Sequence, residues 1–455
     1  MITHLVRNRF ALTLGLMLLF SMAAMGCAQT ASSPASNPGA SAPAAPTSAG
    51  EKAAASAAGN PQEVKVGVLF PLTGVAASTG LDCKDGAELA AEIVNNKYDL
   101  NIPFAKTEGL PNLGNAKLKL VFADHQGVPE KGQSEAERLV TQEKVVALEG
   151  TYLSTVTQTA SQAAERLGIP MINGDSSSIG LTDRGLKYFF RTGAHDGTFV
   201  KNFFDLMDDI QKEKKVSVKT IAVVYENTLQ GADMTKNAKK FADERGYKVV
   251  EEIPFPAGSS EVTSEVQRLK AADPDVVIMQ TQTPDAILFM KTYKQLDYSP
   301  RAILAYGAGF LDPKFFEVLG KDAEYAISKA AWAPDIAEKN PVAKAIADMF
   351  QSKYNQGMTE NSARNFTAIM TLADAINRAK STDPKAIQAA LAATDIPGDQ
   401  LIVPWKGIKF GPDGQNVYAA GVNTQVFGGK HYTVWPFNVA SKQIVWPRPK
   451  WSELK

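Results

Sequence analysis

The chain has 455 residues, more than a usual single domain, so two lobes of roughly 150–200 residues each are expected, both large enough to bury a core. Its 48 Lys and Arg residues balance its 48 Asp and Glu residues, which excludes the strongly basic charge that nucleic-acid binding requires. The only two cysteines, Cys27 and Cys83, are too few for a disulfide framework, and Cys83 is expected to be a buried, unreactive thiol.

The N-terminal segment has the parts of a secretory signal peptide. Arg7 and Arg9 precede an apolar run over residues 10–25, and small residues follow it. The run is too short to span a membrane comfortably. The sequence therefore predicts an exported protein with a signal peptide over residues 1–27.

The cleavage region resembles a lipobox, in which the cysteine is acylated and becomes the new N-terminus. The matching sequence is Ala24-Met25-Gly26-Cys27, and ordinary cleavage after Ala28 is the alternative. Residues 28–62 consist almost entirely of Ala, Ser, Pro, Gly and Thr, a composition that cannot bury a core and is typical of a disordered tether. A tether suits a domain held beside a membrane, so we expect a lipid anchor at Cys27, with a free periplasmic or extracellular protein as the alternative.

From residue 64 onward, short β-branched runs alternate with amphipathic helices. Strands are predicted at 64–70, 118–123, 145–148 and 169–172, and helices around Leu89, over 135–143 and over 154–167, with Gly168 ending the last of these. The alternation restarts with strands at 221–225, 247–255, 276–279 and 303–306, separated by helices over 233–245, 262–270 and 285–296. This pattern predicts an α/β fold with two doubly wound lobes.

The last part of the chain changes character. Long helices are predicted over 341–354 and 361–380, followed by short strands at 407–410, 418–426 and 431–439. Two α/β lobes in one chain place a ligand cleft between the carboxyl ends of their strands.

Several segments match one known family in order and spacing. They are VGVLFPLTG at 66–74, EGTYLSTVT at 149–157, FRT at 190–192, GIKFGPDG at 407–414 and VWP at 445–447. Together they resemble the type I periplasmic-binding-protein family, in its leucine/isoleucine/valine-binding branch. The resemblance implies two lobes joined by three hinge crossings, with lobe 1 formed by 63–193 plus 331–405 and lobe 2 by 194–330 plus 406–455.

The resemblance also implies a function. It is that of a monomeric extracytoplasmic solute-binding protein of an ABC importer, which closes on a small-molecule ligand by hinge bending, delivers it to permease subunits and uses no cofactor or metal. A ligand-sensing receptor subunit of the same fold is one alternative. A secreted hydrolase is another, although the sequence has no G-x-S-x-G elbow, no recognisable triad and no metal-ligand spacing.

In lobe 1 the candidate ligand-binding residues stand where strands pass into helices or loops. Ser154 matches the hydroxyl that holds a ligand carboxylate, assisted by the backbone at Thr155, because a helix N-terminus favours an anion. Capping of the helix is the alternative role for Ser154. Tyr152 would supply an apolar wall or stack on a ring, with core packing as its alternative.

Further candidate residues lie in the loop after the next predicted strand, in the first loop and beside two predicted hinge crossings. Asp175 and Ser177 match a backbone carbonyl and a hydroxyl offered to the ligand, with Ser176 between them, and a plain polar turn is the alternative. Thr79 maps onto the first loop, where members of the family often carry an aromatic residue, and a solvated turn residue is the alternative. Asp196 and Trp332 lie next to predicted hinge crossings.

In lobe 2 the resemblance breaks down. Amino-acid binders of the family hold the ligand ammonium with tyrosine hydroxyls and an acidic residue, whereas the matching positions here carry Gln230, Gln282 and Ala308. Three explanations remain open: Glu226 or Asp285 supplies the negative charge, the ligand is an acid without an amine (including an aromatic acid), or the glutamines recognise an amide.

Overall fold

The computed structural model describes residues 62–438 and 440–454, all within one compact unit that spans residues 58–455. The predicted signal peptide, Cys27 and all but the last residue of the predicted tether lie outside the described residues.

The first sheet has five parallel strands in the order β2-β1-β3-β4-β5. They are β1 (Glu63–Phe70), β2 (Lys117–Asp124), β3 (Ala147–Gly150), β4 (Met171–Asn173) and β5 (Phe189–Arg191). Side chains of β1 alternate between two cores, with Val66 and Val68 in one and Leu69 in the other. A sheet buried on both faces needs such a continuous apolar run.

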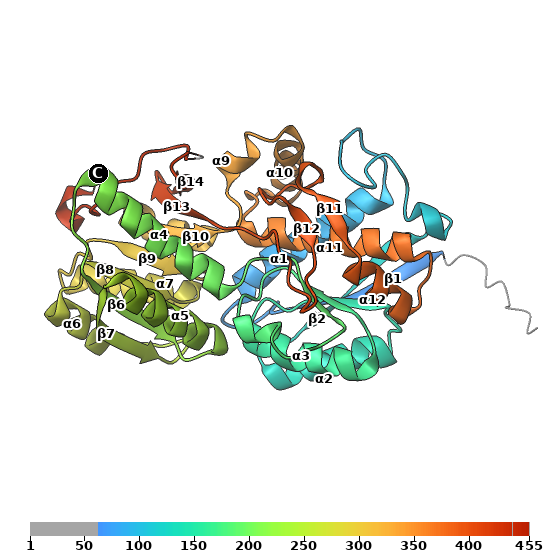
Figure 1. The fold of residues 1–455 in the computed structure, drawn as a ribbon, viewed down its shortest axis with the longest axis horizontal. Coiled ribbons are helices and arrows are strands. Elements are labelled where there is room, and N and C mark those ends of the chain that lie inside the picture. Colours follow the sequence, from blue (N-terminus) through green and yellow to red (C-terminus); the bar gives the residue numbers. More distant parts are fainter. Residues whose placement is uncertain (1–61, 439, 455) are drawn as a thin grey trace, which may run out of the picture. The chain divides into compact units, whose positions relative to one another are not determined.

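Helices cover both faces of this sheet (Figure 1). On one face α1 (Ala77–Asn95) packs against α11 (Glu360–Ala379), and on the other α2 (Pro129–Thr141) packs against α3 (Ser154–Leu167). We call this part lobe 1.

The second sheet has seven strands in the order β14-β13-β10-β9-β8-β6-β7, and we call the part built on it lobe 2. The parallel strands are β6 (Thr220–Glu226), β7 (Lys248–Phe255), β8 (Val276–Gln280), β9 (Ile303–Tyr306) and β10 (Ile327–Ala330). The antiparallel strands β13 (Val422–Phe427) and β14 (Lys430–Trp435) extend it at one edge. The helices are α4 (Asp196–Lys214), α5 (Leu229–Arg245), α6 (Thr263–Ala272), α7 (Thr283–Gln295) and α8 (Pro313–Leu319).

After β10 the chain returns to lobe 1. This return contains α9 (Pro334–Ala337), α10 (Pro341–Tyr354), α11, α12 (Pro384–Ala392), β11 (Asp395–Pro397) and β12 (Gly407–Lys409). Strands β11 and β12 pair with each other, and Gln415 then bridges to Arg191 at the end of β5. The α/β class and the two lobes are therefore confirmed.

Local sequence signals set several helix ends. The predicted stop at Gly168 is confirmed, because this residue follows α3 with a left-handed φ of 65°. The start of α11 is fixed by a capping box, in which the Thr359 side chain accepts a hydrogen bond from the Asn361 N–H.

Some predicted strand bounds were wrong. The strand expected over 145–148 begins only at Ala147, because Lys144 has a φ of 60° and the turn after α2 continues up to the start of the strand. The strand expected over 418–426 begins only at Val422, and the one expected over 431–439 ends at Trp435. Pro436 follows Trp435 and has no N–H to donate to a strand partner.

Candidate ligand-binding cleft

The N-terminus of α3 forms one wall of a cleft between the lobes. Strand β3 ends at Gly150 and α3 begins at Ser154, so the N–H groups of Ser154 and Thr155 lie outside the helical hydrogen-bond ladder. The predicted alternative that Ser154 only caps the helix is wrong, because the N-cap residue is Leu153 and no side chain caps the helix. The Ser154 hydroxyl instead accepts a hydrogen bond from the Ser178 N–H at 3.3 Å.

The opposite wall comes from the carboxyl ends of two neighbouring strands in lobe 2. Glu226 is the last residue of β6, and Thr228 follows it as the N-cap of α5. Gln282 is the N-cap residue of α7, just after β8. Because β6 and β8 are adjacent in the sheet, the starts of these two helices lie side by side.

The two walls close on a small cavity. Its lining residues are Leu153, Ser154 and Thr155 on lobe 1 and Glu226, Thr228, Gln230 and Gln282 on lobe 2. The cavity volume of about 20 Å³ is room for about one water molecule, so the structure shows the cleft closed.

Hydrogen bonds join the walls around the cavity. Tyr152 Oη donates to Gln282 Oε1 at 3.1 Å, and Gln230 Nε2 donates to Ser177 Oγ at 2.9 Å. The hydroxyl of Ser178 bonds to the carboxylate of Asp233. Polar side chains of the two lobes therefore bond directly to each other around the cavity.

A family model described as periplasmic binding protein matches residues 63–429. The chain belongs to the periplasmic binding protein family.

Relatives and solved structures agree with this membership. The "Leu/Ile/Val-binding protein homolog 7" of Brucella suis is 27% identical over 406 residues, which cover 86% of this chain and 96% of the relative. The leucine-binding protein LivK of Thermotoga maritima has a TM-score of 0.69 at 22% identity, covering 81% of this chain and 97% of that one. A solute-binding protein of an ABC transporter from Rhodopseudomonas palustris, in complex with benzoate, has a TM-score of 0.68 at 20% identity, covering 82% and 95%. At these identities the two structures show the fold.

Other predicted site residues of this binding protein lie behind the cleft or outside it. The Ser176 hydroxyl donates to the Tyr152 carbonyl at 2.7 Å and so holds the 150–157 loop. The Asp175 carbonyl accepts from Arg364 at 2.8 Å, and its carboxylate accepts from Cys83 at 3.3 Å. Asp175 is thus bonded to residues of α1 and α11, whereas the Ser177 hydroxyl accepts a hydrogen bond from Gln230 on lobe 2.

Thr79, Asp196 and Trp332 do not line the small cavity. Thr79 lies in a separate hollow of about 210 Å³ beside α1, α8 and the start of α11. Asp196 begins α4 and accepts a hydrogen bond from the hydroxyl of Tyr306. The indole of Trp332 donates to the Ile402 carbonyl at 3.0 Å and is buried.

Arg191 fixes the loop that carries the site serines. This fully buried guanidinium donates to the carbonyls of Ser176 at 3.1 Å and Ser178 at 2.6 Å, and to Gln415 Oε1 at 2.6 Å. In the sequence, Arg191 stood out only as part of the FRT segment that carries the family resemblance. Its contacts show that it supports the loop geometry.

A buried charge cluster joins the lobes near this loop. Lys329 of β10 lies 2.6 Å from Glu360 of α11, and Glu360 also accepts from the Ala331 N–H at 2.5 Å. Arg364 lies 3.3 Å from Asp175 and 4.0 Å from Glu360. Burial lowers the pKa of Lys329, and the neighbouring Glu360 opposes that shift.

Glu149 is a buried acid that the sequence reasoning missed. It lies on β3, is 0% exposed, and neither of its carboxylate oxygens has a hydrogen-bond partner among the described residues. Burial raises the pKa of Glu149 well above its usual range, and the nearby Asp175 raises it further. An acid between Leu148 and Gly150, inside a buried strand, was the signal that could have found it.

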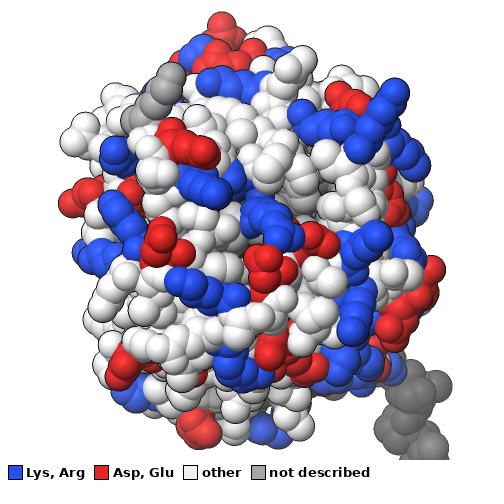
Figure 2. Space-filling model, turned by 90° about the vertical axis from the view of Figure 1, so that its left-hand side faces the viewer, with Lys and Arg blue, Asp and Glu red and all other residues white. Residues whose placement is uncertain are grey.

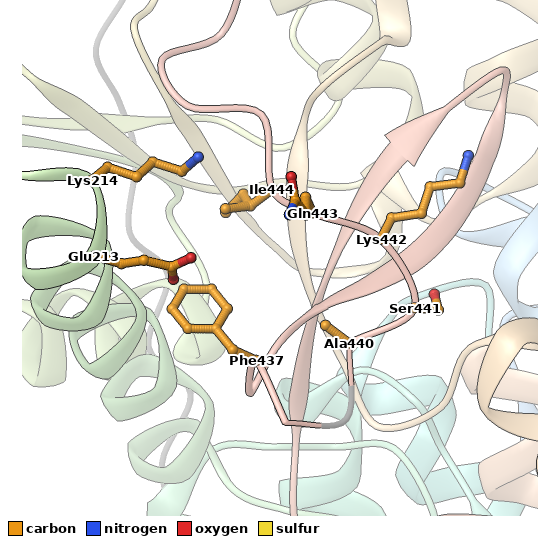
Figure 3. A pocket seen from close by; sticks show the side chains of 8 residues that line it. All are labelled: Glu213, Lys214, Phe437, Ala440, Ser441, Lys442, Gln443 and Ile444. Atoms are coloured by element: carbon orange, nitrogen blue, oxygen red, sulfur yellow. The ribbon is translucent and has the colours of Figure 1, made fainter.

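The molecule has other hollows away from the cleft. A groove of about 350 Å³ lies between the end of α4, at Glu213 and Lys214, and residues of the 437–444 segment, with Phe437 beside Glu213 (Figure 3). It lies at the opposite end of α4 from Asp196, about 27 Å away at the usual helical rise. On the face drawn in Figure 2, basic and acidic side chains are interspersed.

The described residues contain no group of three or more His, Cys, Asp or Glu side chains placed to hold a metal ion. None of the helices in residues 62–438 and 440–454 is both long and apolar enough to cross a bilayer.

Proposed function

We propose that the protein is the extracytoplasmic solute-binding component of an ABC importer. It captures a small carboxylate-bearing solute by hinge closure, delivers it to the permease and catalyses no reaction. The observation that carries the proposal is the closed cavity between the N-terminus of α3 and the carboxyl ends of β6 and β8. Similar solved structures include a complex with isoleucine and a complex with benzoate, and the carboxylate that both ligands carry supports a carboxylate ligand here.

Carboxylate binding follows from the chemistry of the α3 terminus. The first turn of this 14-residue helix presents N–H groups and the positive end of the helix dipole, and the Ser154 hydroxyl lies beside them. When the lobes close, water is excluded and each charge-assisted hydrogen bond gains strength.

A non-catalytic role is supported by the histidines of the described chain. His125 and His431 are bonded to the carbonyls of Thr151 and Phe310, at 3.0 and 2.9 Å, and His195 caps α4. His431 also bonds to the Thr424 hydroxyl at 2.9 Å. Within residues 62–438 and 440–454 no hydrogen bond joins an imidazole to a serine hydroxyl, the contact on which a Ser-His-Asp triad depends.

The test is a ligand screen by thermal shift, with affinities then measured by calorimetry on wild type and Ser154→Ala. The screen covers amino acids, aromatic acids, short-chain acids and amides, since a ligand that binds the folded state raises Tm with its concentration. Loss of a hydrogen bond to a charged group costs about 1.5–3 kcal/mol, so Ser154→Ala is expected to weaken a carboxylate ligand roughly tenfold to a hundredfold.

Ser134→Ala is the matched control, because Ser134 is exposed on α2 and far in sequence from the cleft residues. It should leave the affinity unchanged. Equal affinities for wild type and Ser154→Ala would remove Ser154 from the site, and a screen in which no solute raises Tm would contradict the proposed function.

Family membership implies export, and we propose in addition that Cys27 carries a lipid anchor. The support is the lipobox-like sequence and the Ala/Ser/Pro-rich segment after it. In cells that export the protein, wild type is expected in the membrane fraction and Cys27→Ser in the soluble fraction, as followed by immunoblot. Cys83→Ser is the control and should stay with the membranes; a Cys27→Ser protein found there as well would exclude anchoring through this residue.

A further inference from the structure

The side-chain hydrogen bonds that join the two walls of the cleft are of two kinds. Two of them involve a lobe 2 glutamine that lines the cavity, Gln282 or Gln230. A ligand that fills the cavity therefore competes for both glutamines. The bond between Ser178 and Asp233 is of the second kind, because neither residue lines the cavity. A bound ligand leaves this bond in place.

Asp233 has its side-chain partner on the other lobe. It lies in the second turn of α5 and is half-buried. Within residues 62–438 and 440–454, the one hydrogen bond of its carboxylate comes from the Ser178 hydroxyl, and no ion pair includes it. Because α5 belongs to lobe 2 and Ser178 to lobe 1, this charge-assisted bond exists only while the lobes are closed.

Ser178 connects Asp233 to the start of α3. Ser178 is 0% exposed, and its N–H donates to Ser154 Oγ at 3.3 Å. Its carbonyl accepts from the buried guanidinium of Arg191 at 2.6 Å. With the backbone of Ser178 held on both sides, its hydroxyl is directed at Asp233. One residue thus bonds to the helix N-terminus, to the support of the loop and to the opposite lobe.

The contact with Ser178 also determines what the Ser154 hydroxyl has left to offer. A hydroxyl has one hydrogen to donate and two lone pairs that accept. Because Ser154 Oγ accepts from the Ser178 N–H, its own hydrogen is left for another acceptor, and none is found for it among the described residues. Ser154 lines the cavity, so this hydrogen is available to the carboxylate of a ligand.

We propose that Asp233 is a positioning residue that acts through Ser178. Its bond to Ser178 holds the lobes closed over a bound solute and keeps the Ser154 hydroxyl directed at the carboxylate of that solute. The inference rests on the proposed function and extends it, because it assigns the residue pair that controls how fast the solute leaves.

The position of this bond separates its effect on release from its effect on capture. A solute enters the open cleft before the lobes meet, so the bond does not contribute to the association rate constant. The bond must break before the lobes part, so its loss raises the release rate constant. Changes within one interface act mostly on release for the same reason.

Stopped-flow kinetics of Ser178→Ala and Asp233→Ala test the inference. Ser178→Ala removes the hydroxyl but keeps the backbone N–H that bonds to Ser154, so it isolates the contact between the lobes. Isoleucine and benzoate are the probes, followed by intrinsic tryptophan fluorescence. We expect the release rate constant to rise about tenfold in each variant and the association rate constant to change by less than about twofold. A general loss of structure would lower the association rate constant as well.

Three further variants sharpen this test. The double variant Ser178→Ala/Asp233→Ala should release the probe no faster than either single variant, because the bond is already lost in each of them. Asp233→Asn keeps an acceptor oxygen without the charge, and its release rate constant should lie between those of wild type and Asp233→Ala. Asp243→Asn is the matched control, at an exposed position of α5 about 15 Å further along the helix, and should release the probe as wild type does.

Small-angle X-ray scattering gives a readout that needs no probe. If the bond holds the lobes together, Ser178→Ala and Asp233→Ala should have a larger radius of gyration than wild type before any solute is added, and Asp243→Asn should not. An equal radius in wild type and both variants would overturn the inference.

The outcomes separate this inference from the proposed function. Release rate constants equal to that of wild type in both single variants overturn the role of Asp233 and leave the solute-binding function standing. Tighter binding of the probes by Asp233→Ala overturns it too, since the carboxylate would then only repel the ligand. If Ser178→Ala does not fold, Asp233→Ala decides alone, because Asp233 is only half-buried. If wild type binds neither probe nor any solute of the thermal-shift screen, the proposed function itself fails, and scattering alone tests the bond.

Discussion

Glu360→Ala is expected to lower the free energy of unfolding by about 3–5 kcal/mol, because it leaves the buried ammonium of Lys329 without its partner. Lys329 is 4% exposed and its Nζ lies 2.6 Å from Glu360 Oε1. The substitution also removes the acceptor of the Ala331 N–H. The Phe199 ring, 4.4 Å from the ammonium, offsets only part of this loss. Urea unfolding followed by tryptophan fluorescence measures the change.

The loss in Glu360→Ala should depend on pH. Burial already lowers the pKa of Lys329, and removing Glu360 removes a charge that raises it. Between the lowered folded pKa and the unfolded value, the unfolded state binds more protons than the folded state, so stability rises with pH. The free energy of unfolding of Glu360→Ala is therefore expected to be lowest at low and neutral pH and to rise as the pH approaches about 10.

A surface ion pair gives the control. Asp348 lies 2.9 Å from Lys344, with the two side chains 65% and 45% exposed, so Asp348→Ala should cost no more than about 0.5 kcal/mol. The double variant Lys329→Met/Glu360→Leu should recover much of the lost stability, since it leaves no buried ammonium without a partner and Arg364 keeps Asp175 at 3.3 Å. Similar losses in Glu360→Ala and Asp348→Ala would show that the buried pair contributes nothing of its own.

The fold could be predicted because its signals are local. Strand β9 and helices α3 and α10 were predicted with the observed bounds, since each is a continuous apolar run or an amphipathic stretch with a defined start or stop. The strands of the C-terminal segment were placed less well, because their ends depend on Pro436 and on the edge of a sheet that other strands build.

Only the lobe 1 wall of the candidate site could be predicted, because it depends on a helix N-terminus that the local sequence shows. Ser154, which lines the cavity, was predicted because a strand-to-helix boundary can be recognised from the sequence alone. Glu226 and Gln282 are 56 positions apart in the chain and line one cavity only because β6 and β8 are neighbours in the sheet, so the sequence left three explanations open for this wall. The hydrogen bond from Arg364 to the Asp175 carbonyl likewise forms only because α11 packs against the loop that carries Asp175.

Gly86→Ala is expected to lower the free energy of unfolding by about 2–3 kcal/mol, through overpacking between α1 and α11. A Cβ at this position would lie 2.2 Å from the Ser362 carbonyl oxygen and 2.7 Å from its Cα. These are backbone atoms and cannot rotate away, so the two helices must separate. Replacing a helical glycine by alanine normally stabilises the helix by about 1 kcal/mol. The clash with Ser362 must therefore cost more than this stabilisation for the prediction to hold. Thermal and urea unfolding measure it.

Gly180→Ala is the matched control, because nothing lies within 4 Å of a Cβ there and the residue is exposed. Its stability should stay within about 0.5 kcal/mol of wild type. A Gly86→Ala protein as stable as Gly180→Ala would show that α1 and α11 can move apart without cost. Because α11 carries Glu360 and Arg364, a real separation should also disturb the charge cluster beneath the ligand loop, and double-mutant analysis of Gly86→Ala with Glu360→Ala should then give a coupling different from zero.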